Sequence, residues 1–288
     1  MTLSQGKQVE RMCRLAEVSR AAYYRDWQRT APLSEETELR GVVQQLALAH
    51  RAYGYRRIGA LLRREGRVIN HKRLVRMMRD DNLLCLRKPA FRPATTDSDH
   101  RWRVWPNLAR KMTPMGSNRL WVADITYVHL AEAFVYLAVV LDAFSRKVVG
   151  WALENHFTAV LALGALDMAL RDRHIVPGEL IHHTDRGVQY ACGDYIARLE
   201  AAGIQPSMSR PGCPYDNAIA ESFMKTLKAE EVNATTYQDI DHARSAIGEF
   251  IETVYNRHRL HSALDYRSPM EFELASLTVA TTTTSATL

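Results

Sequence analysis

The hydrophobic pattern changes its period at Leu120, and this change constrains the fold more than any other feature of the chain. Three apolar runs, rich in Val, Tyr and Trp, follow one another at 120–130, 134–142 and 147–153. They predict three successive strands, joined as a meander. Four helical patterns follow, at 158–173, 190–202, 216–230 and 239–255. Two short strand patterns, at 179–183 and 204–208, lie between them. This order predicts one mixed α/β sheet covered by helices.

The part of the chain before this sheet is predicted to be helical and basic. Residues 6–30 carry two short helical patterns, typical either of a helix-turn-helix or of a plain helical hairpin, with Ser19 as the cap of the second. Ser34 is expected to cap a further helix. Residues 50–92 hold 13 Lys and Arg against three Asp and Glu. Two short helices are expected there, Tyr55 to Glu65 and one capped by Asn70, with Gly66 ending the first.

These two helices favour a helix-turn-helix that contacts DNA, because the second carries four basic residues within eight positions and no acid. A helical hairpin with a solvated basic face is the alternative. The residues expected to contact DNA here are Arg56, Arg57, Lys72, Arg73, Arg76 and Arg79.

Charge is distributed unevenly along the 288 residues. Residues 1–120 hold 25 Lys and Arg against 11 Asp and Glu, whereas residues 121–288 hold 13 against 21. The basic part would attract a polyanion, most often nucleic acid. Proline-rich residues 87–118 are interpreted as a linker, either following DNA or packing on the next domain. We therefore expect a helical DNA-binding region at 1–86, an α/β core at 119–277 and a disordered tail at 278–288.

Several protein classes are excluded by composition. No apolar run of 18 residues is present, so a membrane span is not expected, and the polar N-terminus is not a signal peptide. The four cysteines are far apart, which argues against a zinc ribbon or a disulfide framework and favours a reducing cytosol.

Three carboxylates stand in three different chemical settings. Asp124 is in the middle of an apolar strand, on the face of Val122 and Thr126. Asp185 ends a strand, where ligands collect in α/β sheets. Glu221 lies on a helix whose same face carries Asn217, Lys225 and Lys228. Each has an ordinary alternative, respectively a hydrogen-bonded structural Asp, a turn-forming Asp and a surface Glu–Lys pair. Together they are a donor set for Mg²⁺ and for two-metal phosphodiester chemistry.

Beyond these residues, the chain resembles the retroviral-integrase-like transposases of bacterial insertion sequences. The matching motifs are W-V-A-D-I-T-Y at 121–127, H-T-D-R-G-V-Q-Y at 183–190, D-N-A-I-A-E-S-F at 216–223 and Y-N-R-H-R-L-H-S-A-L at 255–264. Asp185 and Glu221 have 35 residues between them, the D,D(35)E spacing of that family, and Lys228 matches its basic residue seven positions after the Glu. The segment from Tyr53 to Asn82 is similar to its helix-turn-helix.

The resemblance implies an RNase H-like core in which Asp124, Asp185 and Glu221 hold two Mg²⁺ ions, with Mn²⁺ as a substitute. The implied activity is cleavage of DNA at element ends, followed by strand transfer of the 3′-hydroxyl. The resemblance also assigns Lys225, Lys228, Asn256 and Arg259 to DNA contact, and His183 and Asn217 to accessory roles beside the site.

The implied partners are DNA, both terminal repeats and target, and further copies of the chain on it. The family product of the second reading frame acts with the first-frame product or as a fusion with it, in the bacterial cytoplasm at the nucleoid. Two other functions stay open: an RNase H-like nuclease that cuts without joining, and a DNA-binding regulator whose α/β core is only a scaffold.

Overall fold

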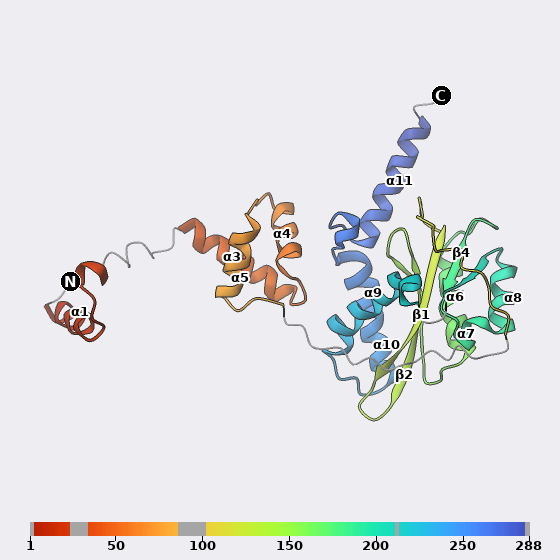
Figure 1. Cartoon of the computed structure of the whole chain (residues 1–288), viewed down its shortest axis with the longest axis horizontal. Coiled ribbons are helices and arrows are strands. Elements are labelled where there is room, and N and C mark those ends of the chain that lie inside the picture. The colour runs from red at the N-terminus through yellow and green to blue at the C-terminus, as the bar shows by residue number, and fades with distance from the viewer. Residues whose placement is uncertain (1–2, 24–33, 86–101, 211–212, 286–288) are drawn as a thin grey trace. The chain divides into compact units, whose positions relative to one another are not determined.

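The computed structural model describes residues 3–23, 34–85, 102–210 and 213–285. The chain divides into two compact units, Met1–Cys85 and Leu86–Leu288 (Figure 1). At the N-terminus, α1 (Leu3–Leu15) is followed by the start of a second helix, where Ala22 N–H donates to the Ser19 hydroxyl at 3.0 Å. The cap predicted at Ser19 is confirmed, and the remainder of that predicted helix lies outside the described residues.

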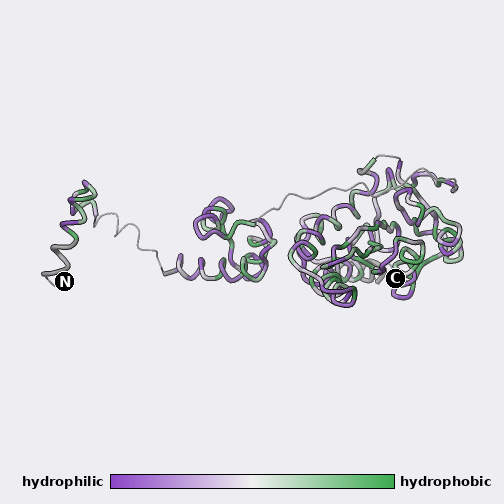
Figure 2. Tube along the Cα trace, turned by 90° about the horizontal axis from the view of Figure 1, so that it is seen from below, coloured by the Kyte–Doolittle hydropathy of each residue, from purple (hydrophilic) through white to green (hydrophobic). Residues whose placement is uncertain are grey.

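Three helices form the rest of the first unit: α3 (Ser34–Ala49), α4 (Tyr55–Arg64) and α5 (His71–Asp80). Gly66 leaves α4 with φ +78°, and the Asn70 side chain accepts from Lys72 N–H at 2.8 Å, so both predicted helix boundaries are confirmed. Hydrophobic and hydrophilic residues alternate along these helices (Figure 2). The side chains buried between them are Val43, Ile58, Leu62, Leu74, Met77 and Met78.

The second unit is built on a five-stranded sheet in the order β3-β2-β1-β4-β5. The strands are β1 (Leu120–His129), β2 (Phe134–Asp142), β3 (Val148–Glu154), β4 (Ile181–Thr184) and β5 (Gln205–Met208). The first three are antiparallel, whereas β4 and β5 run parallel to β1. The predicted meander and mixed sheet are therefore confirmed.

Helices cover both faces of this sheet (Figure 1). On one face, Leu120, Val122 and Val128 of β1 pack with α9 (Ala218–Leu227), α10 (Ile240–Glu249) and the π-helical segment η3 (Phe250–His258). On the other, Trp121 and Ala123 pack with α6 (Ala159–Asp172) and α8 (Gly193–Ala201). The alternation along β1 gives each layer of helices its own apolar surface.

Some predicted helices differ from the observed ones. The helix expected at 190–202 is two helices, α7 (Val188–Ala191) and α8, because Cys192 has an extended backbone with ψ 152°. The helix expected at 216–230 begins as the 3₁₀ turn η1 (Pro214–Asn217), continues as α9 and ends as the π-helical η2 (Lys228–Val232).

The described part of the predicted linker, residues 102–118, packs on the second unit. Leu108 N–H donates to the Ser207 hydroxyl at 2.9 Å, and Ala109 and Met112 contact the apolar core. Of the two alternatives for this stretch, the structure supports packing on the core.

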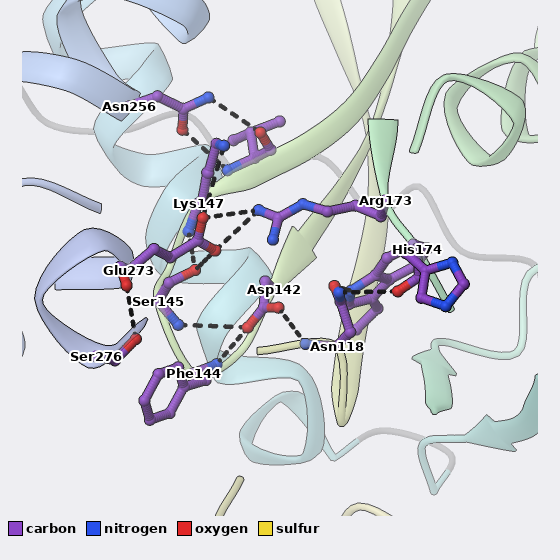
Figure 3. Close-up of polar contacts among 12 residues, drawn as sticks. Asn118, Asp142, Phe144, Ser145, Lys147, Arg173, His174, Asn256, Glu273 and Ser276 are labelled. Atoms are coloured by element: carbon purple, nitrogen blue, oxygen red, sulfur yellow. Dashed lines mark hydrogen bonds and ion pairs between the residues drawn. The ribbon is translucent and has the colours of Figure 1, made fainter. Parts of the chain in front are cut away.

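The C-terminal helix α11 (Pro269–Ser285) follows the short turn η4 (Ser262–Leu264). Residues 278–288 are predicted to be a disordered tail; α11 includes the first eight of them, to Ser285, and residues 286–288 lie outside the described residues. Its base is held to the core by polar contacts (Figure 3). Glu273 accepts from Arg173 at 2.8 Å and from the Ser145 hydroxyl at 2.7 Å.

Candidate active site

Asp124 and Asp185 are brought together by the register of two parallel strands. β1 and β4 pair Val122 with His183, and Thr184 is the last residue of β4. Asp124 and Asp185 stand two residues further along each chain, at the point where the ladder ends. Both line one small cleft at this edge. The two aspartates expected to share a site therefore line the same cleft.

The charges at this cleft act strongly on Asp124. Its side chain is half-buried, and Ile125 N–H donates to Oδ1 at 2.9 Å. Burial, followed by the negative charge of Asp185 and then of Glu221, raises the pKa of Asp124 to about 7, against the opposing effects of the Ile125 hydrogen bond and of Lys228. The cleft thus concentrates negative charge that a cation would compensate.

Glu221 reaches this region because α9 is fastened to β1. The Asn217 side-chain amide donates to the carbonyl of Ala123 at 2.9 Å, directly before Asp124. Glu221 lies one helical turn after Asn217. Its carboxylate is 43% exposed and pairs with Lys225 Nζ at 2.9 Å. Asn217 is therefore a residue that positions the helix, a more specific role than the sequence indicated.

Within the described residues, no three His, Cys, Asp or Glu side chains are already gathered around a single metal position. The donors that suit a metal are nevertheless hard carboxylate oxygens, two in one cleft and a third on the adjoining helix. For Glu221 to take part in binding, its side chain must exchange Lys225 for the cation.

Lys228 lies beside the same cluster of charges. Its ammonium is 4.2 Å from the centre of the Tyr127 ring, a cation–π distance. Burial lowers the pKa of Lys228, and the charge of Asp124 opposes that change. The residue is half-buried, so it is not the ordinary solvated helix lysine that spacing alone allows.

The cleft also has walls that sequence reasoning missed. Phe157, Gln189 and Tyr190 line it together with Ile125 and Gly187. Tyr190 is 3% exposed, and its hydroxyl has no hydrogen-bond partner among the described residues. Gln189 and Tyr190 belong to the quoted motif H-T-D-R-G-V-Q-Y, so their places in that motif were an available signal. Phe157 offered none.

Known families match both units. Two families described as integrase core domain match residues 114–214 and 202–269, and one described as HTH-like domain matches residues 34–91. A protein of the insertion element IS600 from Shigella sonnei is 40% identical over 266 residues, covering 91% of this chain and 97% of its own. The transposase InsF for insertion sequence IS3A from Escherichia coli is 36% identical over 275 residues, covering 93% and 95%. The chain belongs to the insertion-sequence transposases.

The transposase is accordingly an enzyme of the DDE transposase and integrase class, a polynucleotidyl transferase with an HTH-like domain. Among solved structures, the HTLV-2 integrase catalytic core domain in complex with magnesium is 16% identical, with a TM-score of 0.43, covering 56% of this chain and 99% of its own. No described helix of the transposase has the length and apolar character that crossing a membrane requires.

Three residues predicted for the site or for DNA are buried and bonded within the protein. His183 is fully buried, and its ring nitrogens bond the hydroxyls of Ser207 at 2.8 Å and Ser209 at 3.0 Å, so neither is left to orient water. Asn256 is 1% exposed and bonds both the N–H and the carbonyl of Val148 at 3.0 Å (Figure 3).

The third is Arg259. Its side chain is 5% exposed, and its guanidinium pairs with Glu230 at 2.6 Å. Asn256 and Arg259 are thus buried and bonded within the protein, and their contact with DNA stays a prediction. The C-terminal signature that contains them holds the core together.

The basic residues expected to contact DNA lie mostly on the surface of the HTH-like domain. Five of the six side chains are exposed: Arg56, Lys72, Arg73, Arg76 and Arg79. Arg57 is half-buried, with its guanidinium 5.3 Å from the centre of the Tyr53 ring. Arg73 makes only a long ion pair, 3.9 Å, with Glu36 of α3. This surface suits phosphate contact.

Proposed function

We propose that this transposase cuts DNA at the ends of its insertion sequence and joins the freed 3′-hydroxyl to a target phosphodiester. The observation that carries the proposal is the meeting of Asp124 and Asp185 in one cleft, with the charge of Glu221 close enough to raise the pKa of Asp124. Carboxylates gathered this closely repel one another and cost folding free energy, which argues against a core that serves only as a scaffold.

The site fits divalent metal. Asp124, Asp185 and Glu221 would hold two Mg²⁺ ions, and Mn²⁺ would substitute, because carboxylate oxygens are the ligands that both ions accept. Bound there, the ions would activate the attacking oxygen and stabilise the leaving oxygen of an in-line displacement.

The protein's own contribution is placement. Asn217 holds the first turn of α9 against β1, so that Glu221 faces the end of the β1–β4 ladder. Lys228 and Lys225, on the same helical stretch, would hold the phosphate backbone that leads to the scissile bond. The HTH-like domain would bind duplex DNA through α5. Orientation of both strands by these groups supplies much of the rate enhancement expected of such an enzyme.

The proposal is tested by Asp124→Asn, Asp185→Asn and Glu221→Gln, each assayed for cleavage and strand transfer on a labelled element end with Mg²⁺. Every variant should lose both reactions while DNA binding and thermal melting change little. Asp241→Asn, an 84% exposed carboxylate on α10, is the matched control and should stay active. A carboxylate whose loss leaves activity near the wild-type level does not belong to the site.

The same assay separates the alternative function. If the wild-type protein releases a 3′-hydroxyl product but never joins it to a second duplex, the chain is a nuclease.

For partners, we propose that several copies assemble on the element ends, together with the first-frame product or as a fusion with it, at the nucleoid of the bacterial cytoplasm.

A further inference from the structure

One face of the β1–β2 hairpin carries aromatic side chains where β1 has no β4 neighbour. The register pairs Tyr127 with Tyr136 and His129 with Phe134, and paired residues of antiparallel strands share a face. The ring centres of His129 and Phe134 are 4.1 Å apart, and those of Tyr127 and Phe134 are 5.8 Å apart. β4 ends level with the residue before Asp124, so these rings lie beyond the part of β1 that β4 covers.

This face continues into the active-site cleft. Tyr136 stacks on Phe157 with ring centres 5.1 Å apart and planes 29° from parallel, and Phe157 lines the cleft with Asp124 and Asp185. Ile125, another wall of the cleft, shares its face of β1 with Tyr127 and His129. We call Tyr127, His129, Phe134, Tyr136 and Phe157 the aromatic strip.

The ends of the aromatic strip are open to solvent. Phe134 is 50% exposed and Phe157 is 39% exposed. Cross-strand aromatic contacts stabilise a hairpin, but that role does not require two large phenyl rings in water. From Ile125 to His129 the strand advances about 13 Å, which is the length of a few stacked nucleotides.

The aromatic strip has a positive charge, which could bind DNA phosphates, on one side only. Lys228 lies over Tyr127 at the edge of β1 that β4 leaves free. Glu132 in the hairpin turn and Glu154, the β3 partner of Tyr136, border the other sides. A strand of DNA would therefore run along the Lys228 edge, with its bases directed onto the rings.

We propose that the aromatic strip binds unpaired nucleotides of the DNA next to the cut site, by stacking their bases. Aromatic rings hold single-stranded DNA through the faces of the bases, which base-pairing partners cover in a duplex. The inference rests on the proposed function, because it takes the cleft to be the place where DNA is cut. It adds that the transposase holds locally opened DNA there.

The test uses full-length protein and two duplexes of the same sequence carrying 2-aminopurine near one end. One is fully paired, and in the other the labelled bases lie in a short mismatched bubble. The variant Phe134→Leu/Phe157→Leu removes both exposed rings but keeps apolar side chains. Phe144→Leu is the control, since Phe144 packs against Phe272 beyond the opposite end of β2. Thermal melting verifies that both variants fold.

Wild-type protein should quench 2-aminopurine in the bubble. The double variant should lose that quenching and bind bubble DNA at least about fivefold more weakly, as expected for the loss of base stacking. Its affinity for paired DNA should stay within about twofold, and the control should behave as wild type. Equal losses on both DNAs, no loss on bubble DNA, or no quenching by wild type would each overturn the proposal.

Strand transfer by the wild-type protein, measured in parallel, keeps the two proposals apart. If the wild-type protein joins strands while the double variant binds bubble DNA normally, the aromatic strip does not bind unpaired nucleotides, and the proposed function stands. If wild type neither cuts nor joins DNA while the selective binding loss is seen, only the proposed function fails.

Discussion

Asp124 links the stability of the transposase to pH. Because burial and neighbouring carboxylates raise its pKa from 3.8 to about 7, the folded protein holds this proton more tightly than the unfolded chain does. The free energy of unfolding contributed by this group therefore falls as the pH rises from about 4 to 7.

We predict that Asp124→Asn flattens the pH dependence of melting over this range in metal-free protein. Added Mg²⁺ should raise the melting temperature of wild type more at pH 7.5 than at pH 5, since the ion binds the ionised carboxylate. Melting curves at several pH values, with EDTA or Mg²⁺, measure both effects. An equal pH slope in wild type and Asp124→Asn would contradict the prediction.

Tyr190 gives a second prediction for a single residue. Burial, then the charges of Tyr195, Asp124 and Asp185, raises the pKa of Tyr190 well above its usual value, so the hydroxyl stays protonated. With no partner among the described residues, a buried hydroxyl costs about 1–3 kcal/mol. We expect Tyr190→Phe to stabilise the metal-free protein by about 1 kcal/mol or more, measured by urea unfolding. A loss of stability would mean that the hydroxyl has a bonded partner in solution.

Spacing in the sequence indicates which single residues lie near one another, but it does not indicate the distant partners that they bind. Asp124 and Asp185 meet because strand position alone places them at one sheet edge. Arg259 looks like any exposed arginine in sequence, and only the fold brings it to Glu230. His183 was expected to lie beside the site, but Ser207 and Ser209 of the neighbouring strand region bind both its ring nitrogens.

At the scale of elements, the packing of α9 against β1 determines the position of Glu221. A single side-chain amide of Asn217 makes the bond to Ala123, and the side-chain oxygen of the same residue has no partner among the described residues. We predict that Asn217→Ala lowers kcat of strand transfer at least about tenfold, as displacements of catalytic groups do, with KM for DNA nearly unchanged. The melting temperature should fall only slightly, since one hydrogen bond contributes about 1 kcal/mol.

Asn233→Ala is the control for that change, because Asn233 is exposed at the end of η2. Steady-state kinetics of the two variants, compared with wild type, measure the effect. If Asn217→Ala lost stability and activity in proportion, Asn217 would only stabilise the fold and would not position Glu221.

Element type was predictable from sequence, but the irregular parts of the helices were not. The spacing of hydrophobic residues predicted the three antiparallel strands and the helical segment on each side of β4, because each of those elements buries one regular face. In the 3₁₀ turn before α9, Asn217 bonds Ala123 of β1, and in the π-helical turn after it, Glu230 pairs with Arg259; both partners are remote in sequence. No local pattern marks them.

At the scale of the whole molecule, the positive charge is concentrated in the first of the two compact units, which holds 17 Lys and Arg against nine Asp and Glu, whereas residues 86–288 hold 21 against 23. The positive surplus includes the exposed side chains of α4 and α5, whereas the unit that contains Asp124, Asp185 and Glu221 is close to neutral. The second unit offers DNA little net electrostatic attraction. Binding by the basic unit therefore has to supply most of the affinity for DNA.

This division predicts how salt acts on the full-length transposase. Changing Lys72, Arg73, Arg76 and Arg79 together to Ala takes away four cations that can neutralise phosphates. The slope of log K against log salt should become shallower by roughly 0.9 for each phosphate that is no longer neutralised. All four side chains are exposed, so the melting temperature should hardly change. The slope is measured by fluorescence anisotropy of a labelled duplex over a range of salt concentrations.

The control removes the same number of positive charges from the second unit by changing Arg119, Arg198, Arg244 and Arg257 to Ala. Three of these four already pair with Glu179, Asp167 or Asp241, so the loss of net charge is matched while phosphate binding is expected to remain. If the two variants shift the slope equally, net charge alone governs binding. If the α5 variant leaves the slope unchanged, α5 does not contact the phosphates. A shift confined to the α5 variant would establish that helix as the phosphate-binding surface.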